Sequence, residues 1–185
     1  MVLNQLKKLL QKNEPKKTNI RIIVIKIIDN FLEQQDFKNI KNFLLDEKVH
    51  WFYRNCCVNV DDPPYFTFCF YNYDRIQSPA FELIQPILNK LNYSSIIQVR
   101  ANLMLREENE KKIGWHTDYD YKNFKTAIYY IHESNGPTIV KDNKNVKIYP
   151  KENKILIMDG NTEHAAIIQT DKKRRVVLNI NYYEK

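Results

Sequence analysis

The second half of the chain consists of short runs of β-branched and aromatic residues, each separated from the next by turn residues. Runs of this length and composition predict strands rather than helices. The predicted strands cover residues 96–105, 126–132, 137–141, 146–149, 154–158, 163–169 and 174–183. Many short strands in succession are typical of a β-sandwich or a β-barrel, so this half of the chain limits the fold to one of those classes.

The first half carries helical patterns as well as strands. Residues 20–28 are rich in β-branched side chains and predict a strand, after which Asp29 or Asn30 is placed to cap a helix over residues 31–44. Ser78, which precedes a proline, is typical of an N-cap and predicts a second helix. Because the helices precede most of the strands, we expect a mainly β, α+β fold with helices packed on one sheet.

Two further segments of the first half have recognisable patterns. Residues 51–73 alternate aromatic and polar side chains around two consecutive prolines, which predicts a hairpin-like pair of strands. The aromatic side chains of residues 65–73 are expected in the core, and the alternative is stacking on a base or a proline ring. Residues 3–10 have apolar side chains at helical spacing and predict a short basic helix. The chain shows neither an internal repeat nor a linker rich in glycine and serine, so we predict a single domain over residues 1–185.

Composition excludes several classes of protein. With 43% hydrophobic residues the chain can fill a compact core, which excludes a disordered tail protein. The longest apolar stretch, residues 22–28, contains Lys26 and falls far short of the roughly 20 apolar residues of a membrane-spanning helix. Three glycines are too few for a glycine-rich phosphate loop. Three cysteines, two of them adjacent, imply no disulfide framework, so we expect a cytoplasmic, reducing setting.

The net charge of +7 has two interpretations, a nucleic-acid partner or a solvated basic surface. Residues 1–17 contain five lysines and one glutamate, and they therefore account for +4 of this charge. Basic surface helices are commoner than dedicated nucleic-acid arms, so we favour the solvated surface.

Two of the four histidines have neighbours that suggest metal binding. His116 and Asp118 are two residues apart, so in an extended or turn conformation they project to the same side and can hold one ion. His164, near the start of a predicted strand, can supply a third ligand. Two imidazoles and one carboxylate occupy one face of an octahedral ion and leave three positions open, as in non-haem Fe(II) oxygenases. Taken alone, a His-x-Asp pair is more often an ordinary turn.

The last predicted strand has an unusual polar face. Alternation along the strand places Arg175, Asn179 and Asn181 on one side and Arg174 with apolar residues on the other. An inward arginine needs a partner, because burying its charge alone is costly, and its planar fork suits a carboxylate. Tyr130 can donate a second hydrogen bond to the same carboxylate. The alternative is a pair of arginines that face solvent on an edge strand.

Together these motifs resemble the Fe(II)/2-oxoglutarate-dependent dioxygenases, and especially the prolyl-4-hydroxylase-like members found in phages and other viruses. The resemblance covers residues 96–183 and rests on His116-x-Asp118, the strand with Tyr129 and Tyr130, the turn Asn135-Gly136 before Thr138, His164, and the segment from Arg175 to Tyr182. It implies a double-stranded β-helix, a jelly roll of the cupin type, formed by residues 96–183 and supported by residues 1–95.

The resemblance also implies roles for individual residues. His116, Asp118 and His164 would be the catalytic iron ligands, while Arg175 and Tyr130 would bind the distal carboxylate of 2-oxoglutarate. We prefer Arg175 over the neighbouring arginine because its face of the strand is polar.

Several positions carry less certain roles or depart from the family pattern. Arg174 is the competing anchor, and Asn179 and Asn102 are weaker candidates for contacts with the cosubstrate. His132 stands where related sequences often have asparagine, and it can line the pocket or face solvent. Gly136 is followed by proline rather than by the more usual aromatic residue or second glycine. These departures leave the metal site intact and affect the substrate pocket, for which we assign no residue.

The activity implied is the hydroxylation of a C–H bond with Fe(II), 2-oxoglutarate and O2, releasing succinate and CO2. A peptidyl side chain such as proline is the substrate we expect, and no membrane partner is implied. Two alternatives stay open: an AlkB-like oxidative demethylase of nucleic acid, and a catalytically inactive jelly-roll binding module. If the viral likeness holds, the host cytoplasm is the expected location. The sequence does not indicate an oligomeric state.

Overall fold

The computed structural model describes residues 24–142 and 144–185. The predicted basic helix over residues 3–10 and the start of the predicted strand over residues 20–28 lie outside these ranges. Where the structure describes the chain, each predicted strand overlaps an observed one.

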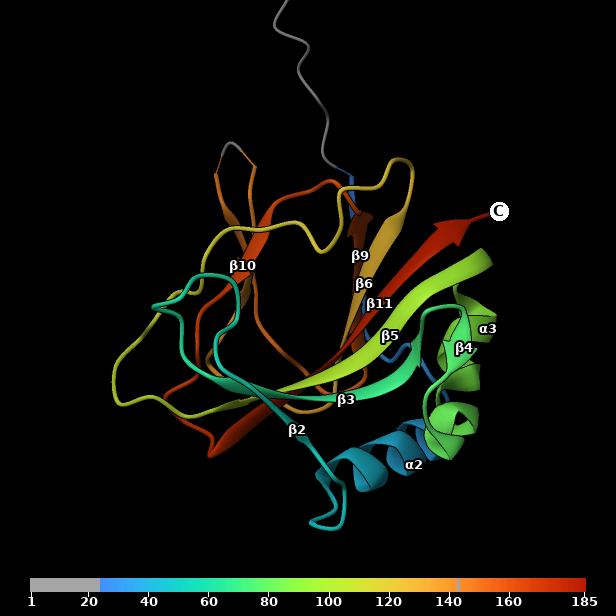
Figure 1. Cartoon of the computed structure of the whole chain (residues 1–185), viewed down its shortest axis with the longest axis horizontal. Helices are drawn as coiled ribbons and strands as arrows, with labels where there is room; N and C mark the ends of the chain where they lie inside the picture. Colours follow the sequence, from blue (N-terminus) through green and yellow to red (C-terminus); the bar gives the residue numbers. More distant parts are fainter. Residues whose placement is uncertain (1–23, 143) are drawn as a thin grey trace, which may run out of the picture.

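A large antiparallel sheet dominates the described part of the chain. Eight strands form it, in the order β1-β9-β6-β11-β5-β3-β2, with β4 paired to β3 (Figure 1). Their bounds are β1 (Ile25–Ile28), β2 (Phe52–Arg54), β3 (Tyr65–Asn72), β4 (Arg75–Ile76), β5 (Tyr93–Leu105), β6 (Lys125–Tyr130), β9 (Lys154–Asp159) and β11 (Arg174–Glu184). Strands β1, β2 and β3, from the first half of the chain, extend the sheet at both of its sides, so that half contributes strands as well as helices.

A second, smaller sheet completes the sandwich. Strands β10 (His164–Ala166), β7 (Thr138–Val140) and β8 (Val146–Ile148) pair antiparallel in the order β10-β7-β8. From β6 onward the described chain passes from the large sheet to β7 and β8 of the small sheet, back to β9, then to β10 and again to β11, as in a double-stranded β-helix. The predicted fold class, a mainly β jelly roll with helices on one sheet, is therefore confirmed.

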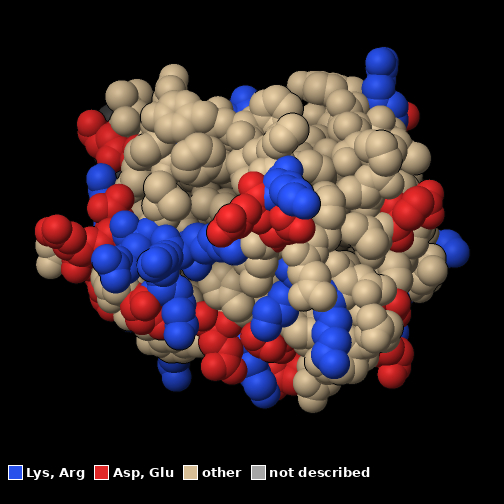
Figure 2. Space-filling view, turned by 90° about the horizontal axis from the view of Figure 1, so that it is seen from below, with Lys and Arg blue, Asp and Glu red and all other residues tan. Residues whose placement is uncertain are grey.

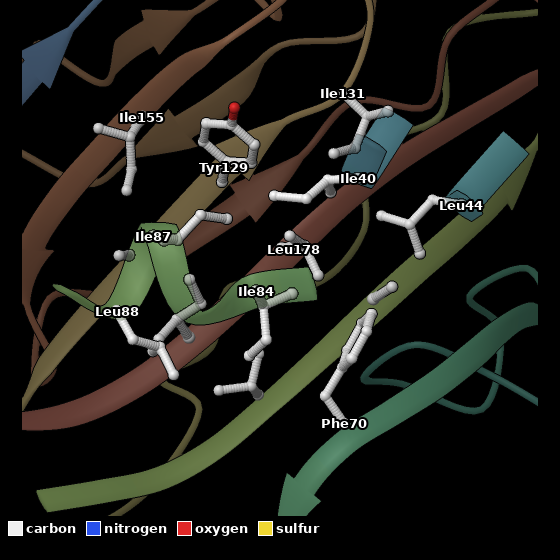
Figure 3. Packing of buried hydrophobic residues seen from close by; sticks show 14 of the residues in the cluster. Ile40, Leu44, Phe70, Ile84, Ile87, Leu88, Tyr129, Ile131, Ile155 and Leu178 are labelled. Carbon is white, nitrogen blue, oxygen red and sulfur yellow. The ribbon is translucent and has the colours of Figure 1, made fainter. Parts of the chain in front are cut away.

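The helices cover the side of the large sheet that faces away from the small one (Figure 1). Helix α2 (Gln34–Leu45) buries Phe37, Ile40 and Leu44, which recur at helical spacing and therefore share one face. They pack with Tyr129 of β6 and Leu178 of β11 in the main hydrophobic core (Figure 3). This layer fixes the sheet from behind and leaves its other face free to carry polar side chains.

The predicted start of α2 is wrong. Its N-cap is Glu33, which makes no side-chain capping bond, rather than Asp29 or Asn30. Asn153 explains the shift. Its backbone C=O accepts a hydrogen bond from the Phe31 N–H at 2.9 Å, and its side-chain Oδ1 accepts one from the Leu32 N–H. Because these bonds hold the chain in a non-helical conformation, the helix begins only after them.

The predicted helix start at Ser78 is confirmed. Ser78 Oγ accepts a hydrogen bond of 3.2 Å from the Ala80 N–H and opens the 3₁₀ helix η1 (Pro79–Ile84), which continues as α3 (Gln85–Lys90). The predicted pair of strands in residues 51–73 is also confirmed, as β2 and β3. The aromatic rings of β3 pack in the core as expected, with Phe68 and Phe70 in edge contact at 4.9 Å.

Charged side chains are spread over the surface. Figure 2 shows the face that carries α2, where lysine and arginine side chains gather toward one side with acidic side chains among them. Within the described residues, no helix is both long enough and apolar enough to cross a membrane.

Candidate metal and cosubstrate site

The structure brings His116, Asp118 and His164 together. One ligand atom of each lies within 4.8 Å of the others, and the two imidazole rings are 4.5 Å apart between centroids. The backbones of His116 and His164 pair across an isolated β-bridge, with N–O distances of 3.0 and 2.9 Å. This bridge joins the loop after β5 to β10, so the fold itself sets the spacing of the two rings.

Hydrogen bonds orient both rings. His116 Nδ1 lies 3.1 Å from the Gly114 carbonyl oxygen, and His164 Nδ1 lies 3.2 Å from the Thr162 carbonyl oxygen. With Nδ1 donating to a carbonyl, each Nε2 keeps its lone pair for a metal ion. Burial lowers the pKa of His164, which favours the neutral, metal-binding imidazole.

The carboxylate of Asp118 is held by residues of two strands. Its Oδ1 accepts from Asn179 Nδ2 at 3.1 Å, and its Oδ2 lies 3.3 Å from the Thr126 hydroxyl. Asn181 is fully buried, and its Nδ2 donates a hydrogen bond of 3.1 Å to Asn179 Oδ1. The Oδ1 of Asn181 lies 2.8 Å from the Thr126 hydroxyl. Asn179 therefore contacts a metal-ligand candidate, and Asn181 supports it from behind.

A cavity of about 310 Å³ opens beside these three side chains. Strands β5, β6 and β11 form its floor, and β7 and β10 form part of the opposite wall. Its lining includes all three metal-ligand candidates together with Asn102, Arg100, Thr138, Asn179 and Arg175. Arg175 and Asn179 are four residues apart on β11, which is about 13 Å along a strand, so the two residues lie toward different ends of the cavity floor.

Arg175 is buried without a counterion. Its Nη2 donates to Thr138 Oγ1 at 3.1 Å and its Nη1 contacts Met104 Sδ at 3.9 Å, but its Nε has no partner. Within the described residues it forms no ion pair. Burial lowers its pKa, which reports the cost of keeping an unpaired guanidinium in this position. A carboxylate entering the cavity would relieve that cost.

Tyr130 lies next to this arginine. Its hydroxyl is 2.9 Å from Thr138 Oγ1, and burial raises its pKa, so the phenol is a neutral hydrogen-bond donor. Thr138, which the sequence analysis did not assign, thus joins Tyr130 and Arg175 in one polar group. The sequence feature that could have pointed to Thr138 is its position just after the Asn135-Gly136 turn.

The competing arginine faces the other way. Arg174 Nη2 donates to the Leu45 carbonyl oxygen at 2.6 Å, on the side of the sheet that α2 covers. His132 also lies outside the cavity, half-buried, with its Nε2 accepting from the Val176 N–H at 3.1 Å. Neither side chain reaches the space beside the metal-ligand candidates.

Asn102 and Arg100 share the inward face of β5. Asn102 lines the cavity with its Oδ1 buried and unpartnered, and Arg100 lines it with its Nε buried and unpartnered. The sequence pointed to Asn102 as a site residue but Arg100 was not expected there, although the alternation that places one inward also places the other. Cys57 lines the cavity too, and burial with the nearby Asp62 raises the pKa of its thiol to about 12.

Comparisons with known proteins bear on the fold. The sequence matches no family model and no curated protein sequence. The structure is similar to the non-haem α-ketoglutarate-dependent carbocyclase SnoK from nogalamycin biosynthesis, with a TM-score of 0.65 and 9% identity over 94% of this chain and 85% of that one.

Two prolyl hydroxylases are similar to a comparable degree. The Pseudomonas putida prolyl-4-hydroxylase matches with a TM-score of 0.60 and 11% identity, over 90% of this chain and 96% of that one. A Trichoplax adhaerens prolyl hydroxylase, solved with a peptide fragment of hypoxia inducible factor, matches with a TM-score of 0.61 and 13% identity. The match covers 97% of this chain and 92% of that one. The chain therefore has the jelly-roll fold that these oxygenases share.

Proposed function

We propose that this protein is an Fe(II)- and 2-oxoglutarate-dependent dioxygenase that hydroxylates a C–H bond and releases succinate and CO2. The observation that carries the proposal is the placement of a buried, unpaired arginine in the same cavity as a cluster of two histidines and an aspartate. Metal ligands alone would fit many functions, and so would an anion site alone. Their combination in one jelly-roll cavity fits a metal enzyme with a carboxylate cosubstrate.

The residues present fit the metal. His116, His164 and Asp118 offer two neutral nitrogens and one carboxylate oxygen, a donor set suited to Fe(II) that leaves three positions open. Asn179 and the two backbone carbonyls behind the histidines fix the orientation of the ligands. Bound Fe(II), with 2-oxoglutarate and O2, supplies the oxidising chemistry.

The residues present also fit 2-oxoglutarate. Arg175 would bind its distal carboxylate through the fork that now has an unpartnered Nε, and Tyr130 and Thr138 would donate hydrogen bonds to it. The unpartnered Oδ1 of Asn102 lies on the same cavity floor as an acceptor. Because Arg175 lies toward the end of the floor away from Asn179, it would orient the keto-acid end of the molecule toward the metal ligands.

The substrate we propose is a peptidyl side chain such as proline. The prolyl hydroxylases among the similar structures, one of them bound to a peptide, support this choice. The phage or viral type of the family and the cytoplasmic location stay predictions from the sequence, as does the single domain over residues 1–185.

The test is calorimetric titration of 2-oxoglutarate into the metal-free protein and into the protein loaded with Mn(II) as a stand-in for Fe(II). We expect binding only in the presence of metal. Peptides containing proline would then be assayed with Fe(II) and O2 for succinate formation and for a mass increase of one oxygen. Folded protein that binds no 2-oxoglutarate with metal present would contradict the proposal and leave a jelly-roll binding module.

A further inference from the structure

Arg100 has no role in the function proposed above, yet it lines the same cavity. It is half-buried on β5, its Nε is buried without a partner, and no other described residue forms an ion pair with it. A guanidinium held partly out of water without a counterion is costly, so its presence in a cavity indicates an anion that arrives with a ligand.

The position of Arg100 separates it from the cosubstrate anchor. Arg100 pairs in register with Asn179 on β11, whose side chain contacts Asp118, whereas Arg175 pairs with Met104. Arg100 and Met104 are four residues apart on β5, about 13 Å along the strand. Arg100 therefore lies at the metal-ligand end of the cavity floor, where a substrate must approach.

The two cysteines near Arg100, Cys57 and Cys69, supply no negative charge. Burial raises the pKa of the Cys57 thiol to about 12, and burial also raises the pKa of the Cys69 thiol although the Arg100 charge opposes the shift. Both groups are therefore neutral near pH 7.

The charge balance of the loaded cavity points the same way. Two arginines and one aspartate are the charged side chains among its described lining residues. A divalent metal ion and doubly charged 2-oxoglutarate cancel each other, and Asp118 cancels one arginine. One positive charge then stays uncompensated after metal and cosubstrate are bound, and Arg100 is the arginine left without an anion.

We propose that Arg100 binds a carboxylate of the substrate, close to the C–H bond that is oxidised. This inference rests on the proposed function, since it takes the metal ion and 2-oxoglutarate to occupy the rest of the cavity. The planar fork of arginine, with its Nε–H free, suits the two oxygens of a carboxylate. In a peptide substrate this group is an aspartate or glutamate side chain, or the chain terminus, next to the hydroxylated residue.

The experiment uses the full chain loaded with Mn(II) and saturating 2-oxoglutarate, with acetate as the probe. Mn(II) accelerates the relaxation of the acetate methyl protons when acetate binds nearby, so the readout requires no turnover. We expect saturable relaxation in the wild type and a loss of acetate affinity of about 10-fold or more in Arg100→Gln, as for a charged hydrogen bond. Arg75→Gln removes an exposed arginine of β4 outside the cavity and should behave as wild type.

Three results would overturn the inference. Unchanged acetate relaxation in Arg100→Gln would place the acetate elsewhere, for instance on the metal ion itself. The absence of saturable relaxation in the wild type would show that no carboxylate binds there. The affinity for phosphate can be measured in the same way from ³¹P relaxation. If phosphate binds at least 10-fold more tightly than acetate, the site is assigned to a phosphate group instead.

Calorimetry of 2-oxoglutarate on the same samples separates this inference from the proposed function. If the wild type binds no 2-oxoglutarate with Mn(II), the proposed function fails and the inference fails with it. If the wild type binds 2-oxoglutarate and Arg100→Gln loses that binding as fully as Arg175→Gln, Arg100 is a second cosubstrate anchor. Arg100→Lys, which keeps the charge without the fork, guards against misfolding and should bind acetate with intermediate affinity.

Discussion

The side-chain amide of Asn179 donates a hydrogen bond of 3.1 Å to Asp118 Oδ1, and Asn181 donates one of the same length to Asn179 Oδ1. Both asparagines belong to β11, one of the most buried strands, whereas Asp118 lies in the loop after β5. The bonds therefore hold a loop carboxylate in place against a rigid strand.

Removing the Asn181 amide, which hydrogen-bonds Asn179, should weaken metal binding. In Asn181→Leu the amide of Asn179 loses the donor that fixes it, and Asp118 becomes freer to turn. Loss of an outer hydrogen bond of this kind typically lowers metal affinity about 10- to 100-fold. Calorimetric titration with Mn(II) measures the change, and Asn92→Leu, at an exposed position, is the control. Equal Mn(II) affinity in Asn181→Leu and wild type would show that these bonds do not orient the ligand.

Arg175→Gln should separate cosubstrate binding from metal binding. The variant loses the charged fork in the cavity but touches none of the metal-ligand candidates, so Mn(II) affinity should stay close to wild type. The affinity for 2-oxoglutarate should fall about 10- to 100-fold, the scale of a charged hydrogen bond. Arg174→Gln is a matched control, since it removes the neighbouring charge on the opposite face of the same strand. Loss of 2-oxoglutarate binding in Arg174→Gln alone would identify that residue as the anchor instead.

Arg175→Met should stabilise the ligand-free protein. Arg175 is 4% exposed, lacks a counterion among the described residues and leaves its Nε unpartnered. An apolar side chain of similar length removes that cost, and replacements of buried charges have stabilised other proteins by about 1–4 kcal/mol. Thr138 keeps Tyr130 as its partner. Scanning calorimetry should show a Tm raised by about 2–4 °C per kcal/mol for a chain of this size. A lower Tm would mean that the contacts of Arg175 outweigh its desolvation.

Much of the fold follows from local patterns. The short runs of β-branched and aromatic residues predicted every strand of the jelly roll from β5 onward. The alternation of side chains along residues 174–183 correctly placed Arg175 and Asn179 on the same face, which is the cavity side. The His-x-Asp pair and the distant His164 meet because β10 lies beside the loop that carries His116.

The remaining features depend on contacts between segments far apart in the chain. Thr126 and Arg100 enter the site because the strand registers set them opposite Asn181 and Asn179. The start of α2 is set by Asn153, which is more than a hundred residues away. No local propensity encodes such pairings, since register is fixed by the packing of whole strands.

His132 should make the stability of the metal-free protein depend on pH. Its Nε2 accepts from the Val176 N–H at 3.1 Å, so this bond requires an unprotonated Nε2. Burial lowers its pKa below the usual 6.5, and the charges of Arg175, Lys41 and Arg174 lower it further. The folded state thus favours the neutral ring, while the unfolded chain takes up a proton near pH 6.5. The contribution of His132 is complete above that pH and is lost as the pH falls toward the lower folded value.

The variant His132→Asn tests this, because asparagine can still accept from the Val176 N–H but cannot titrate. Urea unfolding of the metal-free protein at pH 7.5 and pH 5 should show a smaller loss of unfolding free energy in the variant than in the wild type. The other ionisable groups are the same in both proteins, so the difference between the two pH dependences reports His132 alone. Parallel pH dependences would mean that the protonated ring is accommodated in the fold, with the Val176 N–H satisfied by another acceptor.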